Sequence, residues 1–235
     1  MSDYVNEREK NVLDDPNLKL YGMPVGNSRR SPSMHFYYAN NRPRIDVYTN
    51  VEDDSDDGKI RADLESTKDL DAFFAMVQRT IDNPATDFAH VMEVHESFYI
   101  KAENRFDEPK LRSKLVTGRD KEGRMFVALL STKESRPKIL FYFKAGRKHP
   151  FYKRGEKPNE IESSTIAAEG WLASLRRAYD YVIPTAYKHK EKQPPKGGKG
   201  GGGGYNRNSG GGGGNKDYYA DDKGSNDDTG DNLPF

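Results

Sequence analysis

The chain has 235 residues, no cysteine, 32% charged residues, a formal net charge of +1 and a mean hydropathy of −0.98. This composition excludes disulfide bridges and thiolate metal sites, and it holds no apolar run of the roughly 18 residues that cross a membrane. Because its first ten residues, MSDYVNEREK, lack an apolar segment, we expect no secretory signal and a cytoplasmic protein without a membrane partner.

An irregular segment is predicted for residues 1–32, because Pro16, Pro24 and Pro32 interrupt it. Alternation of apolar and polar residues then predicts a series of β-strands. These strands are expected at residues 34–38, 44–50, 59–65, 90–100, 111–117, 124–131 and 138–144. A hairpin turn is expected at residues 118–123.

Two helices are predicted among these strands. The first begins at the cap candidates Ser66 and Thr67 and ends before Pro84. Its apolar stripe follows helical spacing and consists of Leu70, Phe73, Phe74, Val77 and Ile81. The second is expected from Ser164 to Ile183, where Pro184 should stop it. Its buried side is predicted to contain Trp171, Leu175, Ala178 and Val182.

The order of elements predicts an α+β domain over residues 33–187, with a β-rich antiparallel core and two helices. Three strands, a helix and further strands fit an OB-type barrel, which we favour narrowly. The alternative is a duplicated sheet-plus-helix fold of the Whirly or transcriptional-coactivator kind. It would explain why residues 41–48 (NRPRIDVY) resemble residues 135–142 (SRPKILFY), although coincidence would explain the match as well.

Charge is sorted along the chain in a way that the net value hides. Residues 1–109 carry 13 Lys/Arg and 22 Asp/Glu, whereas residues 110–160 carry 15 Lys/Arg and 5 Asp/Glu. A cationic segment with interspersed aromatic residues is typical of surfaces that bind single-stranded nucleic acid. The expected contacts are Lys110, Arg112, Lys114, Arg119, Arg124, Phe126, Arg136, Lys138, Tyr142, Lys144, Arg147, Lys148, Phe151, Tyr152, Lys153 and Arg154.

The C-terminal region has the composition of a linker and an acidic tail. Residues 188–216 are first basic and then glycine-rich, since residues 197–214 hold 12 of the 22 glycines. Residues 217–235 contain six Asp and one Lys and end in Leu-Pro-Phe. We expect neither segment to contribute to a folded core.

The last nine residues, DDTGDNLPF, resemble the C-terminal peptide of bacterial and phage single-stranded DNA-binding proteins. The resemblance implies an OB-type fold, a role in replication and recombination, and a phage origin with action in the host cytoplasm. It also implies that the tip docks on a polymerase, helicase or primase. The residues expected to dock are Asp227, Asp228, Asp231, Leu233, Pro234 and Phe235.

No enzymatic motif is recognised, and we expect neither catalysis nor a cofactor. The acidic residues from Asp53 to Asp57 resemble a calcium loop, but Leu64 stands where its closing glutamate is required. We therefore expect a solvated loop and no metal site. An RNA-binding chaperone or a transcription regulator stays open as an alternative function, and a metal-dependent nuclease is less favoured. The sequence also leaves a homo-oligomer open.

Overall fold

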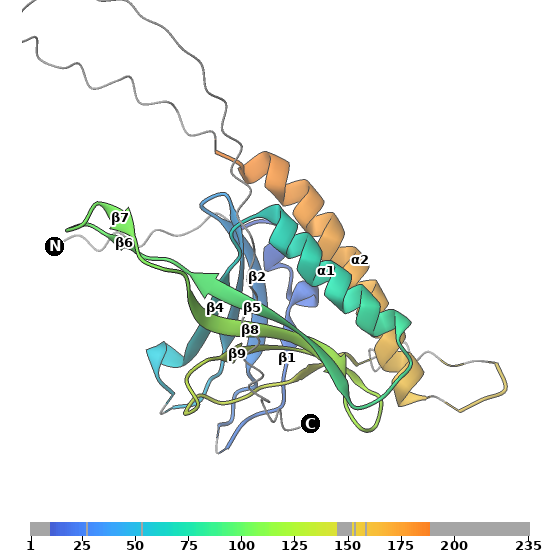
Figure 1. Ribbon diagram of the computed structural model, residues 1–235. Helices are drawn as coiled ribbons and strands as arrows, with labels where there is room; N and C mark the ends of the chain where they lie inside the picture. The colour runs from blue at the N-terminus through green and yellow to red at the C-terminus, as the bar shows by residue number, and fades with distance from the viewer. Residues whose placement is uncertain are drawn as a thin grey trace, which may run out of the picture. The chain divides into compact units, whose positions relative to one another are not determined.

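The computed structural model describes residues 10–26, 28–52, 54–144, 152, 154–157 and 159–188. Its fold is α+β with antiparallel sheets and two helices, which confirms the predicted class. A four-stranded sheet followed by one helix occurs twice along the chain (Figure 1). The predicted linker and tail, from residue 189 onward, lie outside the described residues.

The first unit is a sheet in the order β1-β2-β3-β4, followed by a helix. Its elements are β1 (Leu20–Tyr21), β2 (Ser33–Ala39), β3 (Arg42–Tyr48), β4 (Lys59–Asp63) and α1 (Thr67–Asp82). Asn40 and Asn41 connect β2 to β3, and both have positive φ angles. This conformation matches the twist of an antiparallel hairpin and is one that Asn tolerates.

The N-terminal segment is more ordered than we expected from its prolines. Three short 3-10 helices occur in the first unit, two of them before β1: η1 (Val12–Asp14), η2 (Pro16–Leu18) and η3 (Asp56–Gly58). Leu13 and Leu18 are buried in the core, at 1% and 5% exposure. The first unit therefore includes residues that the sequence prediction left outside the domain.

The second unit is a sheet in the order β10-β9-β8-β5, followed by a longer helix. Its elements are β5 (Phe88–Glu96), β8 (Lys110–Arg119), β9 (Met125–Ser131), β10 (Phe141–Tyr142) and α2 (Glu160–Ala186). A two-stranded hairpin of β6 (Tyr99–Ile100) and β7 (Arg105–Phe106) is inserted between β5 and β8. The sequence prediction had merged β5 and β6 into one strand.

Both helices begin at a side-chain cap. Ser66 and Asp69 form a capping box at α1, in which each side chain accepts from the other residue's backbone N–H. The predicted stripe of α1 is buried as expected. At α2 the Asn159 side chain accepts from the Ile161 N–H. Pro184 lies inside the last turn of α2, so the expectation that it stops the helix at Ile183 is wrong.

The two units share one hydrophobic core. The helices pack against each other, and α1 contacts β3 and also β5 and β8 of the second sheet, whereas α2 contacts β2 and β9 (Figure 1). Trp171 of α2 lies between the sheets, with its ring 5.4 Å from Phe36 and 5.1 Å from Phe143. Its indole N–H donates to the Leu18 carbonyl over 2.9 Å. Most buried apolar residues of the two units thus belong to one cluster, and a small second cluster lies on the other side of the second sheet.

Gly118 of β8 pairs with Ala89 of β5, at a point where the two strands leave no room for a side chain. A Cβ atom at this position would lie 2.2 Å from the Phe88 carbonyl oxygen and 3.0 Å from the Phe126 ring. A contact of 2.2 Å is shorter than real Cβ atoms make, so only glycine allows this pairing of β5 with β8. The close approach also seats the Phe126 ring against the outer side of the sheet.

The strands in the described part of the chain form open sheets, and the OB-type barrel is not confirmed. Each half of the described chain holds a four-stranded sheet and a helix, and the duplicated sheet-plus-helix alternative stays a prediction. The matching octapeptides do not mark it, however. Residues 41–48 contain β3, the third strand of its sheet, whereas residues 135–142 lead into β10, the fourth strand of the other.

Candidate nucleic-acid interface

The first sheet turns its polar side chains away from the core. Along β2, β3 and β4 the alternate residues Met34, Phe36, Ile45, Val47 and Ile60 are buried in the core. The intervening residues lie on the outer face in cross-strand rows. The rows are Ser33-Tyr48-Lys59, His35-Asp46-Arg61 and Tyr37-Arg44-Asp63, and Tyr21 of β1 extends the first of them.

Cationic side chains outnumber carboxylates on this outer face. Asp46 is 2% exposed, and Lys59 and Arg61 contact its carboxylate over 2.7 and 3.2 Å. Arg44 forms a second ion pair with Asp63. Arg42 is exposed and has no carboxylate partner among the described residues. The Lys59 ammonium also lies 5.1 Å from the centre of the Tyr48 ring, so aromatic and cationic groups are in direct contact here.

A hydrogen-bonded chain through His35 holds the aromatic residues of this face in place. The His35 ring hydrogen-bonds the Ser33 hydroxyl over 2.9 Å and the Tyr37 hydroxyl over 3.0 Å. It also meets the Tyr48 ring edge to face at 4.9 Å. Burial, followed by the positive charge of Lys19, lowers the pKa of His35 to about 4. The imidazole is therefore neutral at physiological pH and serves as a rigid spacer between two tyrosines.

This lowered pKa predicts a pH dependence of stability. The unfolded chain takes up a proton at His35 below about pH 6.5, whereas the folded chain takes it up only near pH 4. The free energy of unfolding should therefore fall by up to about 3 kcal/mol as the pH drops through this window. The measurement is urea unfolding at a series of pH values, and His35→Gln should flatten the curve.

His95→Gln is the matched control for this experiment. His95 is exposed on β5, and its replacement removes an imidazole without touching the hydrogen bonds of Ser33, His35 and Tyr37. A His35→Gln curve that stays as steep as the wild-type curve would contradict the assignment to His35.

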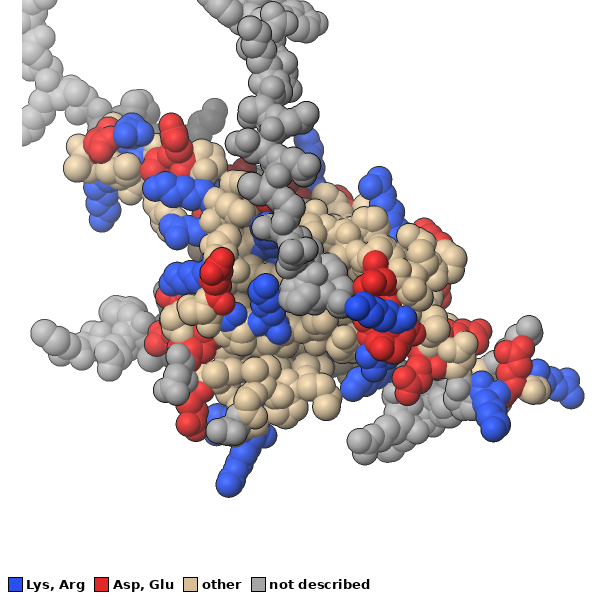
Figure 2. All heavy atoms as spheres, turned by 60° about the horizontal axis from the view of Figure 1, so that its bottom comes forward, with Lys and Arg blue, Asp and Glu red and all other residues tan. Residues whose placement is uncertain are grey.

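The second sheet has a more apolar outer face. Val116, Phe126 and Ala128 form a cluster there that is separate from the core, with Leu130, Tyr142 and other residues packed around it. Figure 2 shows a largely uncharged area on the face toward the viewer, with cationic and acidic side chains mixed around it. Charged side chains of both signs therefore lie around the uncharged area on this side of the molecule.

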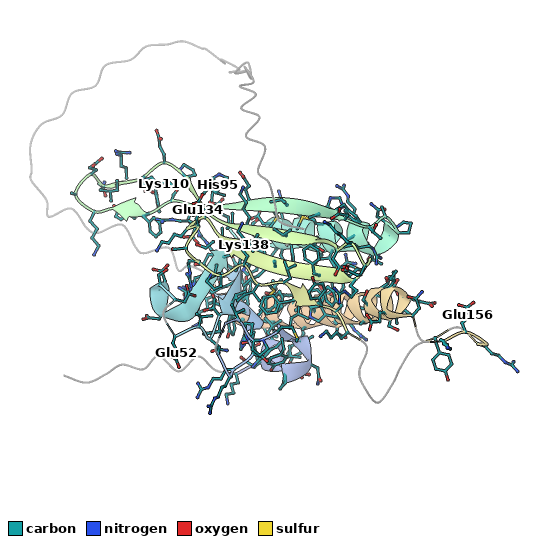
Figure 3. All side chains as sticks on the ribbon, turned by 90° about the horizontal axis from the view of Figure 1, so that it is seen from below. Glu52, His95, Lys110, Glu134, Lys138 and Glu156 are labelled. Carbon is teal, nitrogen blue, oxygen red and sulfur yellow. The ribbon has the colours of Figure 1, made fainter. Side chains whose placement is uncertain are left out.

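Many of the predicted contact residues lie on this second face. Lys110, Arg112 and Lys114 occupy alternate positions of β8, and Lys114 is half-buried beside Glu93 at 3.8 Å. Figure 3 shows Lys110 and Lys138 toward the end of the sheet from which the β6–β7 hairpin projects. Across the sheet, the Arg124 guanidinium lies 4.9 Å from the centre of the Tyr142 ring. The predicted residues thus gather at two ends of an apolar centre.

Three predicted contact residues are buried and cannot meet a ligand at the surface. Arg119 is 2% exposed and donates to the carbonyls of Ile81, Asn83 and Gly123 and to the Thr165 hydroxyl. Arg136 is 5% exposed and is held by an ion pair with Asp54. Phe126 is fully buried in the outer cluster. These expectations are corrected: the two arginines tie parts of the fold together.

The remaining predicted contacts divide into two groups. Lys138, Lys144, Tyr152 and Arg154 are exposed. The others lie outside the described residues, namely Arg147, Lys148, Phe151 and Lys153, together with the tail residues Asp227, Asp228, Asp231, Leu233, Pro234 and Phe235.

A groove of about 560 Å³ lies where β1 approaches β10. Lys19 and Tyr21 line it from the first unit, and Tyr142 and Lys144 line it from the second. Trp171 also lines the groove. Because Tyr21 and Tyr142 belong to the outer faces of their sheets, the groove connects the edges of the two faces.

Sequence reasoning missed the outer face of the first sheet. The signal was present, because Arg44, Asp46 and Tyr48 alternate with apolar residues along β3. It was hidden by the net negative charge of residues 1–109, to which the loop after β3 contributes Glu52 and four Asp. Within β2, β3 and β4 themselves, four Lys/Arg stand against two Asp.

The acidic loop after β3 contributes to the fold in its described part. Asp54 is buried and accepts hydrogen bonds from Arg136 and Thr49, and Asp56 pairs with Lys133 at 2.8 Å. The expectation of a freely solvated loop is therefore wrong for Asp54. Among the residues with described positions, no three His, Asp or Glu side chains cluster as a metal site requires. Asp53 lies outside them.

Comparisons with protein-family models, with curated proteins and with solved structures found no match for this chain. Neither described helix combines the length and apolar character that crossing a membrane demands. Function is therefore inferred from the surface residues themselves.

Proposed function

We propose that this protein binds single-stranded DNA without sequence preference, shelters it, and recruits replication and recombination proteins through its C-terminal tip. The observation that carries the proposal is the outer face of the first sheet. There His35, Tyr37 and Tyr48 are held next to Arg44, Lys59 and Arg61. Cationic groups that meet phosphates, beside rings on which nucleobases stack, form the usual surface for sequence-tolerant binding.

The second sheet supports the same function with different residues. Arg112 and Lys138 are exposed. Arg112 is close enough to Asp107 to contribute to the lowered pKa of that carboxyl, after the Phe98 backbone and Lys110. Arg124 and Tyr142 offer a cationic group and a ring in contact. Burial and the nearby Asp120 raise the pKa of Tyr142, so its hydroxyl stays protonated. The proposed DNA path follows one outer face, passes the groove between β1 and β10, and continues on the other face.

The proposal also includes the type of fold. A single chain with two units of four strands and a helix resembles a duplicated Whirly or coactivator arrangement more than an OB barrel. Open sheets leave part of their outer faces accessible, at the residues around the buried cluster of Val116, Phe126 and Ala128 on the second sheet and along the polar rows of the first. Two faces in one chain give a single-stranded ligand two platforms without the need for a second copy.

The tail supports the recruiting part of the proposal. Its six Asp and terminal Leu-Pro-Phe provide charge steering and one aromatic anchor for a pocket on a polymerase, helicase or primase. The acidic residues also compete for cationic groups on the chain's own surface. Both uses are consistent with a phage replication protein acting in the cytoplasm of its host.

Deleting residues 217–235 should raise the affinity for poly-dT, and the gain should be largest at low salt. The deletion removes a net charge of −5 that competes with phosphates for the same cationic side chains. The measurement is a fluorescence titration of the full chain and the truncated chain across a salt series. A matched chain in which the six Asp of this segment become Asn separates charge from length.

Two outcomes would count against the proposal. Failure of both the full and the truncated chain to bind poly-dT would refute the function. Equal affinity of the full and truncated chains at every salt concentration would refute the competing tail and leave the function standing. Competition between DNA and RNA of the same length decides between DNA sheltering and the RNA-binding alternative, because only a contact at the 2′-hydroxyl distinguishes the two.

A further inference from the structure

The β6–β7 hairpin extends the paired strands β5 and β8 beyond the rest of the second sheet. The last pair of the β5–β8 ladder is Glu96 and Lys110, and the chain between them folds back on itself through the pairs Tyr99–Phe106 and Ile100–Arg105. The Asp107 N–H also donates to the Phe98 carbonyl over 2.9 Å. Figure 1 shows this hairpin projecting away from the sheets and helices.

Three aromatic rings of the hairpin are open to solvent. Phe98, Tyr99 and Phe106 are 49%, 48% and 64% exposed. Tyr99 and Phe106 meet edge to face at 5.3 Å and an interplanar angle of 62°. A two-stranded ribbon gains little stability from rings in water, and neighbouring exposed aromatic residues usually mark a contact surface. Their exposure and mutual contact are what a surface that meets another molecule would show.

The residues around the rings identify the chemistry of that partner. The Arg112 guanidinium lies 4.6 Å from the centre of the Phe98 ring. Arg112 and Lys110 occupy alternate positions of β8 and therefore share one face of the strand. Figure 3 shows Lys110 at the base of the hairpin. Two acidic groups nearby are engaged locally, since Glu103 pairs with Arg105 at 2.6 Å and Asp107 with Lys110 at 3.4 Å. Glu96 and Glu108 also lie in this segment, and Glu108 is exposed. The rings thus continue the proposed DNA path.

We infer that the β6–β7 hairpin is a finger on which nucleobases of the bound single strand stack, with Tyr99 and Phe106 as the stacking residues. This inference rests on the proposed function and extends it beyond the two sheet faces. Phosphates flanking the stacked bases meet Arg112 and Lys110. Stacking on a phenyl or phenol face needs no particular base, so the finger lengthens the binding site without adding sequence preference.

The test uses the full chain with the double substitution Tyr99→Ala and Phe106→Ala. Anisotropy titration with oligo-dT of about 30 nucleotides should show binding weakened by about tenfold to a hundredfold. Tyr181→Ala on α2 is the matched control, because Tyr181 is 66% exposed and lies outside the proposed path. The control should bind as the wild type does. Photocrosslinking to a strand that contains 5-iodouracil should label Tyr99 or Phe106.

The possible results distinguish failure of the hairpin inference from failure of the proposed DNA-binding function. If wild-type chain binds and the double variant binds equally well without a crosslink at the hairpin, the finger is refuted and the proposed function stands. If wild-type chain itself does not bind, the proposed function fails and the finger with it. Loss of self-association in sedimentation at unchanged DNA affinity would identify a second copy as the partner, and it would overturn the inference too.

Discussion

Replacement of Arg136 by Met should lower the free energy of unfolding by about 3–5 kcal/mol, although Arg136 lies in a loop. Its guanidinium makes two hydrogen bonds to the Asp54 carboxylate, at 2.7 and 2.9 Å, and a third to the Lys59 carbonyl at 2.8 Å. The two side chains of this ion pair are 3% and 1% exposed. Removing the arginine leaves a buried carboxylate without its counter-charge, and this accounts for most of the expected loss of stability.

The ion pair joins the two units of the fold, because Arg136 precedes β10 and Asp54 follows β3. Unfolding by urea, followed through the fluorescence of the single tryptophan, Trp171, measures the loss. Lys133→Met is the matched control in the same loop, since Lys133 and Asp56 form a pair with half of each side chain exposed. Its cost should stay below about 1 kcal/mol. Equal losses in the two variants would contradict the role of Arg136.

The same pair gives stability a second pH dependence, at more acidic values. Burial alone would raise the pKa of Asp54, but hydrogen bonds from Arg136 and Thr49 outweigh it and lower the pKa. A carboxyl with a lowered folded pKa stabilises the protein above its unfolded value near 3.9 and loses that contribution as the pH falls below it. Arg136→Met should therefore remove the part of the acid sensitivity that lies below the window of His35.

Much of the secondary structure could be predicted because its causes are local. The stripe of α1 and its capping box need only residues within one helix, and both occur as expected. The alternation along β9 places Met125, Val127 and Leu129 on the core side for the same reason, but it does not predict that Phe126 and Ala128 on the other side are buried too. The short strands β1, β6 and β10 were missed or overextended, since two residues show no period. Their existence depends on partners elsewhere in the chain.

The role of a cationic residue could not be predicted from its neighbours in sequence. Arg119 and Arg112 lie on one strand, yet Arg112 is exposed whereas Arg119 is buried. Arg119 donates to two carbonyls of a distant segment, Ile81 and Asn83, and to the Gly123 carbonyl of the adjoining turn. Side-chain alternation assigns the two to opposite faces only once the core side of β8 is known. The net charge of residues 1–109 was misleading for a related reason. Acidic residues in the loops of this segment offset the cationic residues that lie on one face of the first sheet.

Loss of two cationic side chains on either outer face should weaken binding to single-stranded DNA by about tenfold to a hundredfold at low salt. Arg42→Gln with Arg61→Gln tests the first sheet. Asp46 keeps Lys59 as its partner in this variant, so the fold should survive. Arg112→Gln with Lys138→Gln tests the second sheet. The salt dependence is the sharper readout. The slope of the logarithm of the binding constant against the logarithm of the salt concentration should become shallower by about 0.7 for each phosphate that no longer meets a cation, hence by about 1.4 per variant.

Lys68→Gln with Arg177→Gln is the matched control, because it removes the same charge from exposed positions on α1 and α2. If it lowers the slope as much, net charge alone governs binding and neither face is a site. If one face variant behaves like this control, the single strand uses only the other sheet.

Combining the two face variants decides whether one DNA strand spans both sheets. On a long oligonucleotide the two losses should add in free energy, because the residues lie on separate sheets and share no partner. On an oligonucleotide that covers only one sheet they should not add. The strand is then free to occupy whichever face keeps its cations, and a single-face variant loses little. This difference between long and short ligands is what a continuous path over two platforms predicts.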